Sequence, residues 1–240
     1  MTEGWIPSER GYLIDDLCRN LARVSANEGW FRQIWLGVEL WQMPEDLIRL
    51  QALIWDVKPD WIVETGTKFG GSAIFFASLL QLSGGRPDAG VVSVDVRLSD
   101  EVRDQIARHP QGGRVRALIE GDAADPAVIA EIAAQLESSP GRVLVFLDDN
   151  HNADHVYQEM IGYAPLVSVG SYLVVADTVF ADLAGTPVGQ TTEKYPDVAR
   201  SNPRVAIERF LAERGDFERK PAPIPHGPGN FLDAFLQRVC

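Results

Sequence analysis

The sequence predicts an α/β fold in which a doubly wound, Rossmann-like sheet of mostly parallel strands is covered by helices. Two observations lead to this prediction. Short apolar runs rich in valine, isoleucine and phenylalanine alternate with stretches that are long enough for helices. Several of these runs are almost continuously hydrophobic, as expected for strands that are buried on both faces of a parallel sheet.

The N-terminal part precedes this alternation, and we expect residues 1–58 to form a helical, aromatic-rich extension. Apolar residues between positions 13 and 24 recur on one face of a helix that begins near Ser8. Pro44 opens a second helix, which ends before Pro59. Five of the six tryptophans precede position 56, and this crowding fits core packing, a subunit interface or the wall of a substrate pocket.

The alternation itself begins after Pro59, and residues 59–240 are expected to form the sheet domain. Ser99 and Asp125, the latter followed by Pro126, are typical helix N-caps. The expected strands cover residues 61–65, 91–96, 115–120, 142–148 and 171–177, and the expected helices cover residues 70–83, 99–108, 126–138 and 153–164.

The C-terminal part interrupts the pattern. Residues 178–202 contain several glycines and prolines and show no period, and a loop of this length in a compact domain is usually functional, so we expect a lid. A helix is expected from Pro203 onward. Two further strands, within residues 216–221 and 230–239, are joined by a turn-rich segment.

Composition and charge exclude several classes of protein. With 45% hydrophobic and 23% charged residues, the chain is neither disordered nor fibrous. Its net charge of −12 repels polyphosphate, which argues against nucleic acid as a partner. No apolar run is long enough for a membrane span, and the N-terminus lacks the pattern of a signal peptide. The only two cysteines, Cys18 and Cys240, point to a reducing compartment, so we expect a cytoplasmic protein.

A glycine-rich turn follows the first strand of the sheet domain. The residues Glu64, Thr65, Gly66, Gly70, Gly71 and Ser72 belong to the segment ETGTKFGGS, which also opens a helix. Glycines there allow a sharp turn and a close approach to a ligand, with helix N–H groups facing it. The spacing is neither that of a phosphate-binding P-loop nor that of a dinucleotide fingerprint. An ordinary strand–helix turn is the alternative.

Two single acids follow the next two strands. Asp95 ends the second strand, where a carboxylate can accept hydrogen bonds from both ribose hydroxyls of a nucleoside. Asp122 ends the third strand, where it either accepts from an adenine amine or caps the next helix.

The segment LDDNHNADH follows the fourth strand and carries most of the chemical information. Asp148 and Asp149 are adjacent carboxylates that repel one another unless a cation or hydrogen-bond donors are present, and Asp177 ends the neighbouring fifth strand. Oxygen ligands suit Mg²⁺, so Asp149 and Asp177 are the expected core of a metal site. The alternative is that the pair caps the helix at residue 153.

The same segment contains His151 and His155, four residues apart. This spacing allows a zinc site, but the glutamate of the H-E-x-x-H pattern is missing. His151 lies on the loop at the carboxyl end of the strand and is better placed as a general base. His155 is expected to be a polar helix residue.

Together, ETGTKFGGS, SVDVR, EGD, LDDNHNADHV and YAPLVSVGSYLVVADTVF resemble the cephalosporin hydroxylase/rhamnosyl O-methyltransferase family, from about residue 35 to the C-terminus. The resemblance implies a seven-stranded S-adenosylmethionine (SAM) methyltransferase sheet that ends in a hairpin. It places SAM against Glu64, Gly66 and Asp95, with residues 70–72 around the methionine portion and Asp122 near adenine. We also assign Thr65 and Asp148 to the cofactor site.

The resemblance further implies a Mg²⁺ ion on Asp149 and Asp177. Some relatives have a second acid at the end of the fifth strand, where this chain has Ala176, so a ligand is missing or is replaced by Asp148, Asn150 or water.

The predicted activity is therefore O-methyl transfer from SAM to a hydroxyl of a small molecule, a sugar or a secondary metabolite, by a homo-oligomer. Asp149 would hold the metal and His151 would take the proton. Two alternatives are a nicotinamide-dependent oxidoreductase or hydroxylase component and a non-catalytic SAM-binding accessory subunit. The 31-residue step from Glu64 to Asp95 counts against a nicotinamide site, where about 20 residues are usual.

Overall fold

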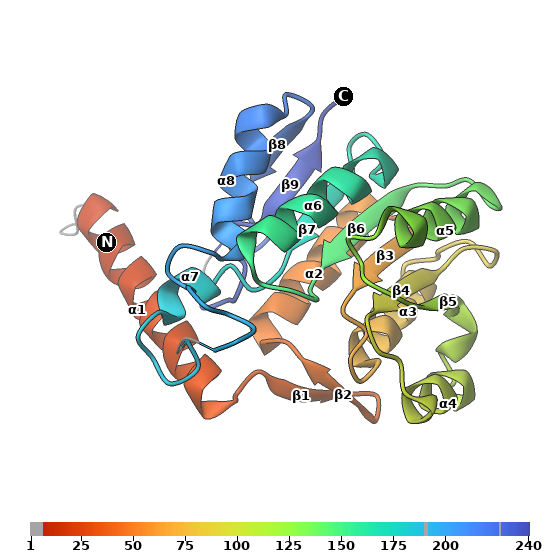
Figure 1. Ribbon diagram of the computed structural model, residues 1–240, viewed down its shortest axis with the longest axis horizontal. Helices are drawn as coiled ribbons and strands as arrows, with labels where there is room; N and C mark the ends of the chain where they lie inside the picture. Colours follow the sequence, from red (N-terminus) through yellow and green to blue (C-terminus); the bar gives the residue numbers. More distant parts are fainter. Residues whose placement is uncertain (1–6, 190–191, 226) are drawn as a thin grey trace, which may run out of the picture.

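The computed structural model describes residues 7–189, 192–225 and 227–240, and its centre is one seven-stranded sheet (Figure 1). Its strands are β3 (Trp61–Thr65), β4 (Val91–Asp95), β5 (Val115–Glu120), β6 (Val143–Leu147), β7 (Tyr172–Val175), β8 (Phe217–Lys220) and β9 (Phe235–Arg238). They lie in the order β5-β4-β3-β6-β7-β9-β8. The first five are parallel, and β9 is antiparallel to both β7 and β8. The predicted doubly wound sheet with a C-terminal hairpin is confirmed.

The two central strands explain where the functional residues gather. All residues of β3 and β6 are buried, which is why both strands are continuous apolar runs. Thr65 pairs with Val94 of β4 on one side and with Leu147 of β6 on the other. The chain order reverses between β3 and β6, and ligands bind at such a switch point outside the carboxyl ends of the strands.

Helices cover both faces of the sheet (Figure 1). They are α2 (Pro44–Val57), α3 (Gly71–Leu82), α4 (Asp100–Arg108), α5 (Pro126–Glu137), α6 (Ala153–Tyr163) and α8 (Pro203–Glu213). Helices α5, α6 and α8 pack side by side on one face, and α2 packs against α3 on the other. Ser99 and Asp125 cap α4 and α5 as expected, since their side chains accept from backbone N–H groups. No helix of the described ranges is long and apolar enough to cross a membrane.

The expected helical N-terminal part is present, and it also contains a hairpin that was not expected. Helix α1 (Pro7–Glu28) and α2 are present, but β1 (Arg32–Trp35) and β2 (Val38–Trp41) form a hairpin between them. Leu36 and Gly37, with φ of 49° and 90°, make the left-handed turn that two-residue hairpins favour. The alternation was hidden in the sequence because each strand has only four residues.

The segment expected to form a lid contains regular structure. Residues 178–202 contain the short helix α7 (Phe180–Leu183) and a parallel bridge between Ala184 and Gly189, while residues 190 and 191 lie outside the described residues. Ala22 and Ala26 of α1 pack against Val179 and Leu183 in a small cluster apart from the main core. Helix α1 therefore supports this segment from behind.

Candidate functional site

A cavity of about 690 Å³ lies at the switch point, within the range usual for small-molecule sites. Its walls come from the ends of the central strands, the β1–β2 hairpin, α7 and the loop around residue 195. Nine of the residues predicted from the sequence line it: Gly66, Gly71, Ser72, Asp95, Asp122, Asp148, Asp149, His151 and Asp177. The other three, Glu64, Thr65 and Gly70, do not line it.

The glycine-rich turn is fixed by close backbone contacts rather than by side chains. Gly66 has a φ of 91°, and a Cβ there would lie 2.3 Å from the carbonyl oxygen of Asp148. A Cβ on Gly71 would lie 2.1 Å from the carbonyl oxygen of Glu39. The backbone N–H of Asp148 donates to the carbonyl of Thr65 at 3.1 Å. These glycines therefore let the turn after β3 touch both the end of β6 and the hairpin.

Glu64 is buried directly beneath this turn. Its Oε1 accepts from the Ser93 hydroxyl at 2.6 Å, whereas Oε2 has no partner among the described residues. Burial raises the pKa of Glu64 to about 7, and the hydrogen bond from Ser93 acts in the opposite direction. A cationic ligand above the turn would favour the ionised form.

Asp95 and Asp122 both face the cavity but differ in their bonding. The carboxylate of Asp95 accepts from the backbone N–H of Lys68 at 2.7 Å and from that of Arg97 at 3.0 Å. Carboxylate oxygens have further lone pairs, so Asp95 can still accept from a ligand. Asp122 accepts from the backbone N–H of Ala124 at 2.9 Å in the turn before α5, and the alternative that it caps this helix is wrong because the N-cap is Asp125. The contact of Asp122 with adenine stays a prediction.

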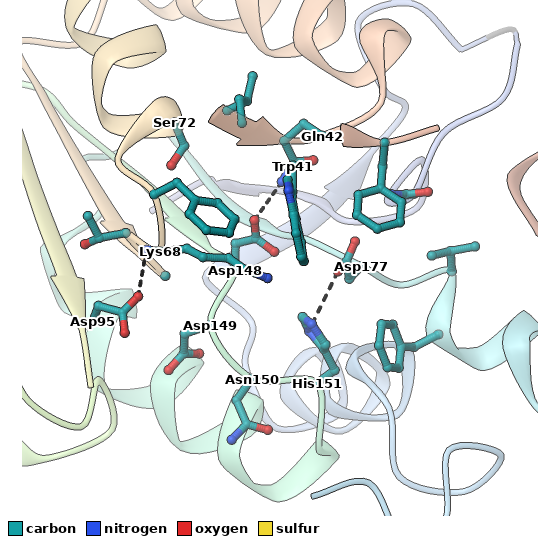
Figure 2. Close-up of a pocket in the computed structure, with 18 of the residues that line it drawn as sticks. Trp41, Gln42, Lys68, Ser72, Asp95, Asp148, Asp149, Asn150, His151 and Asp177 are labelled. Carbon is teal, nitrogen blue, oxygen red and sulfur yellow. Dashed lines mark hydrogen bonds and ion pairs between the residues drawn. The ribbon is translucent and has the colours of Figure 1, made fainter. Parts of the chain in front are cut away.

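The adjacent acids after β6 point to different neighbours (Figure 2). Asp148 Oδ2 accepts from Gln42 Nε2 at 2.6 Å, and burial, followed by the charge of Asp177, raises the pKa of Asp148 well above its ordinary value. Asp149 Oδ2 instead lies 3.3 Å from His155 Nε2. Burial alone would raise the pKa of Asp149, but the hydrogen bond with His155 helps to lower it.

The helix-capping alternative for these two acids is wrong. The N-cap of α6 is Asn152, whose own N–H donates to Asn150 Oδ1 at 3.0 Å. The structure also separates the two histidines that suggested zinc, because His151 lies against Asp177 and His155 against Asp149.

The two expected metal ligands, Asp149 and Asp177, do not belong to one group of ligands. Among the described residues, the group that could hold a metal ion is Asp149, His155 and Glu159, whose ligand atoms lie within 4.8 Å of one another. Ala176 offers no side-chain ligand beside Asp177. We therefore route no chemical step through a metal.

His151 and Asp177 form a pair on the lid side of the cavity. His151 Nε2 lies 3.3 Å from Asp177 Oδ2, and Asp177 has a left-handed φ of 54°, a strain that is typical of functional sites. The His151 ring stacks on Tyr195 at 5.6 Å and lies 4.3 Å from the Phe180 ring, centroid to centroid. Burial lowers the pKa of His151 below its ordinary 6.5, against the opposing charge of Asp177. A neutral, oriented imidazole is the form that accepts a proton.

Several lining residues were not singled out from the sequence. Trp41 and Gln42 come from β2 and the residue after it, and Tyr195 comes from the loop beyond α7. The aromatic crowding had suggested a pocket wall as one of three roles, and Trp41 has that role. Trp35 instead packs against Phe75, which is core packing.

Comparison with known proteins finds one matching family model, the rhamnosyl O-methyltransferase/CmcI family, over residues 27–238. The chain is 32% identical to the rhamnosyl O-methyltransferase of Mycobacterium leprae over 80% of this chain and 77% of that protein. It is 31% identical to the enzyme of that name from Mycobacterium tuberculosis, over 66% of this chain and 61% of that protein. The chain thus spans about three fifths of the length of the latter relative.

Two solved structures share the fold. CmcI with magnesium and SAM superposes with a TM-score of 0.58 at 19% identity, covering 87% of this chain and 77% of that chain. The O-methyltransferase TomG from Streptomyces achromogenes, in complex with SAM, superposes with a TM-score of 0.54 at 17% identity, covering 98% of this chain and all of that chain (100%).

Proposed function

The chain belongs to the rhamnosyl O-methyltransferase/CmcI family, and from this premise we propose that it transfers the methyl group of SAM to a hydroxyl group of a small molecule. The proposed acceptor class is a sugar, because the curated relatives are named rhamnosyl O-methyltransferases. One observation carries the proposal: the glycine-rich turn, Asp95 and the His151–Asp177 pair all line one cavity at the switch point.

The two sides of the cavity would bind the two substrates, SAM and the acceptor. On the side of β3 and β4, the turn and Asp95 offer backbone N–H groups and carboxylate oxygens that suit the amino acid and ribose portions of SAM. On the side of β7 and α7, His151, Phe180 and Tyr195 offer a polar group between aromatic rings, which suits a sugar hydroxyl. The acceptor would enter from this second side.

When bound, SAM supplies a methyl group on a sulfonium, and the methyl–sulfur bond breaks as the oxygen–methyl bond forms. His151 takes the hydroxyl proton on its ring nitrogen, and Asp177 orients the ring and stabilises the imidazolium that results. Phe180 and Tyr195 exclude water from this pair. The products are a methyl ether, S-adenosylhomocysteine and one proton, which His151 returns to solvent.

The proposal is tested with purified protein, deuterated-methyl SAM, and dTDP-rhamnose or a nitrophenyl rhamnoside as acceptors. Mass spectrometry should detect an acceptor that carries one deuterated methyl group, and His151→Asn should lower the rate by about 10²–10⁴-fold. Calorimetry with S-adenosylhomocysteine and NADH in parallel separates this function from the nicotinamide alternative. Binding of NADH without binding of S-adenosylhomocysteine would refute the proposal, and tight SAM binding without transfer to any acceptor would favour the accessory-subunit alternative.

The expectation of Mg²⁺ remains a prediction that the structural similarity to a magnesium-bound CmcI suggests. Asp149, His155 and Glu159 are a group that could hold such an ion, so the assay is run with and without a chelator.

A further inference from the structure

A second group of polar side chains lies beside the cavity, and the proposed transfer step does not use it. The group consists of Asp149, which follows β6, and of His155 and Glu159 on α6. Figure 2 shows the Asp149 carboxylate apart from the His151–Asp177 pair, to which the proton transfer is assigned. The group therefore needs an explanation of its own.

Glu159 is the member of this group that indicates a ligand. Its side chain is fully buried, and neither of its carboxylate oxygens has a hydrogen-bond partner among the described residues. Asp149 Oδ1 is likewise buried without a partner in the described part of the chain. Burying a carboxylate is costly, and buried charges in proteins are therefore paired or coordinate metal ions.

The spacing of the three side chains fits one bound ion. Their ligand atoms all lie within 4.8 Å of one another. His155 Nε2 lies 3.3 Å from Asp149 Oδ2 and 3.7 Å from Glu159 Oε2. Nitrogen and oxygen ligands that bind a tetrahedral ion at about 2.1 Å lie roughly 3.4 Å from one another. An ion therefore fits between these atoms with only small movements of the side chains.

The fold brings the three ligands together from two elements. Residues four apart lie on one face of a helix, so α6 presents both His155 and Glu159 to the end of β6. Asp149 and His155 line the cavity, whereas Glu159 is buried and does not line it. Asp122, which follows β5 and also lines the cavity, has its Oδ1 3.8 Å from His155 Nε2. The open side of the group therefore faces the cavity.

We infer that Asp149, His155 and Glu159 bind one divalent transition-metal ion such as Zn²⁺, with an open coordination position toward the cavity that takes a water or a ligand oxygen. The imidazole ligand favours such an ion over Mg²⁺, which prefers oxygen ligands. Asp177 takes no part, and this separates the site from the ion expected on Asp149 and Asp177. The inference goes beyond the proposed transferase function and requires neither SAM nor an acceptor.

A metal titration of the full chain tests the inference, with Co²⁺ as the probe because its visible absorption reports nitrogen and oxygen ligands. Chelator-treated protein should bind one equivalent of Co²⁺, which Zn²⁺ displaces and an equal concentration of Mg²⁺ does not. Glu159→Gln keeps the size of the side chain and removes its charge, so it should weaken Co²⁺ binding at least about tenfold. A wild-type protein that does not bind Co²⁺ saturably would overturn the inference.

Two variants serve as controls for the titration. Glu131→Gln removes the same charge as Glu159→Gln from an exposed position on α5, and Asp177→Asn changes the other expected metal ligand. Both should bind Co²⁺ as the wild-type protein does. Equal weakening in Glu131→Gln and Glu159→Gln would show that net charge is responsible. Loss of binding in Asp177→Asn but not in Glu159→Gln would place the ion on Asp177. Either result would overturn the inference.

Thermal unfolding gives a second readout and shows that each variant is folded. Saturating Zn²⁺ should raise the Tm of the wild-type protein, but not that of Glu159→Gln or of His155→Asn, because an ion stabilises only a folded protein that binds it. An equal rise in all three proteins would overturn the inference, since the ion would then bind elsewhere. Calorimetry with S-adenosylhomocysteine on the same samples tests the proposed function separately, and its failure would leave the metal site in place.

Discussion

The buried carboxyl of Glu64 makes stability depend on pH in a way that one substitution can isolate. Its pKa of about 7 exceeds the ordinary 4.5, so the folded protein holds a proton that the unfolded chain releases. Because the folded-state pKa is raised, the contribution of Glu64 to the stability of the protein is fully present below pH 4.5 and is lost as the pH rises through 7. Glu64→Gln removes the titration but keeps an oxygen that can accept from Ser93.

The expected magnitude follows from the two pKa values. The difference between about 7 and 4.5 corresponds to roughly 3 kcal/mol when the wild-type group is ionised in the unfolded chain and titrates fully. Glu64→Gln should therefore unfold with a free energy about 3 kcal/mol higher than wild type near pH 8, and only about 1 kcal/mol higher near pH 5.5. In Tm, the difference near pH 8 should be roughly 6–12 °C for a chain of this size.

The assay is chemical denaturation of the ligand-free protein at both pH values, followed by tryptophan fluorescence. Glu131→Gln is the control, since Glu131 lies exposed in the middle of α5 and should change stability by less than about 0.5 kcal/mol at either pH. A Glu64→Gln variant that is no more stable near pH 8 than near pH 5.5, relative to wild type, would refute the reasoning, because burial would then not be what raises this pKa.

Three further predictions concern the site. The kcat/KM of the wild-type enzyme should rise with pH through an apparent pKa below 6.5 and then stay level, because the neutral form of His151 is the base. A rise centred above pH 6.5, or a kcat/KM that does not rise at all in the pH range where the protein is folded, would contradict this prediction. Tyr195→Ala should shift this rise in kcat/KM to higher pH, since removing the Tyr195 ring reduces the burial that lowers the pKa of His151. An unchanged steady-state pH profile would argue against the stacking of Tyr195 on His151. Gly66→Ala should lower the free energy of unfolding in urea by at least about 3 kcal/mol, because the new Cβ would lie 2.3 Å from the carbonyl oxygen of Asp148. Gly84→Ala is the control and should lower it by only about 1 kcal/mol, since Gly84 has a φ of 80° but nothing within 4 Å of the new Cβ. Equal decreases in both variants would mean that backbone strain, and not the steric clash, is the cause.

Much of the site could be predicted because parallel strands end at a common edge. Asp95, Asp148 and Asp177 were assigned to that edge from apolar runs alone, and each of them lines the cavity. The different partners of Asp148 and Asp149, Gln42 and His155, could not be predicted. Both faces of β6 are buried, so no polar alternation marks which direction the next side chain takes, and neighbouring side chains point to opposite sides.

The amino-acid sequence by itself determined the order of the strands of the seven-stranded sheet and of the helices between them, the caps of α4 and α5, and the edge of the sheet where the cavity lies, since these depend on local periodicity and backbone preference. Only the tertiary structure decided that Trp41 covers Lys68 and that Tyr195 stacks on His151. Such contacts join residues from separate loops and short strands, whose positions are set by packing against the rest of the molecule and leave no periodic signal in the chain.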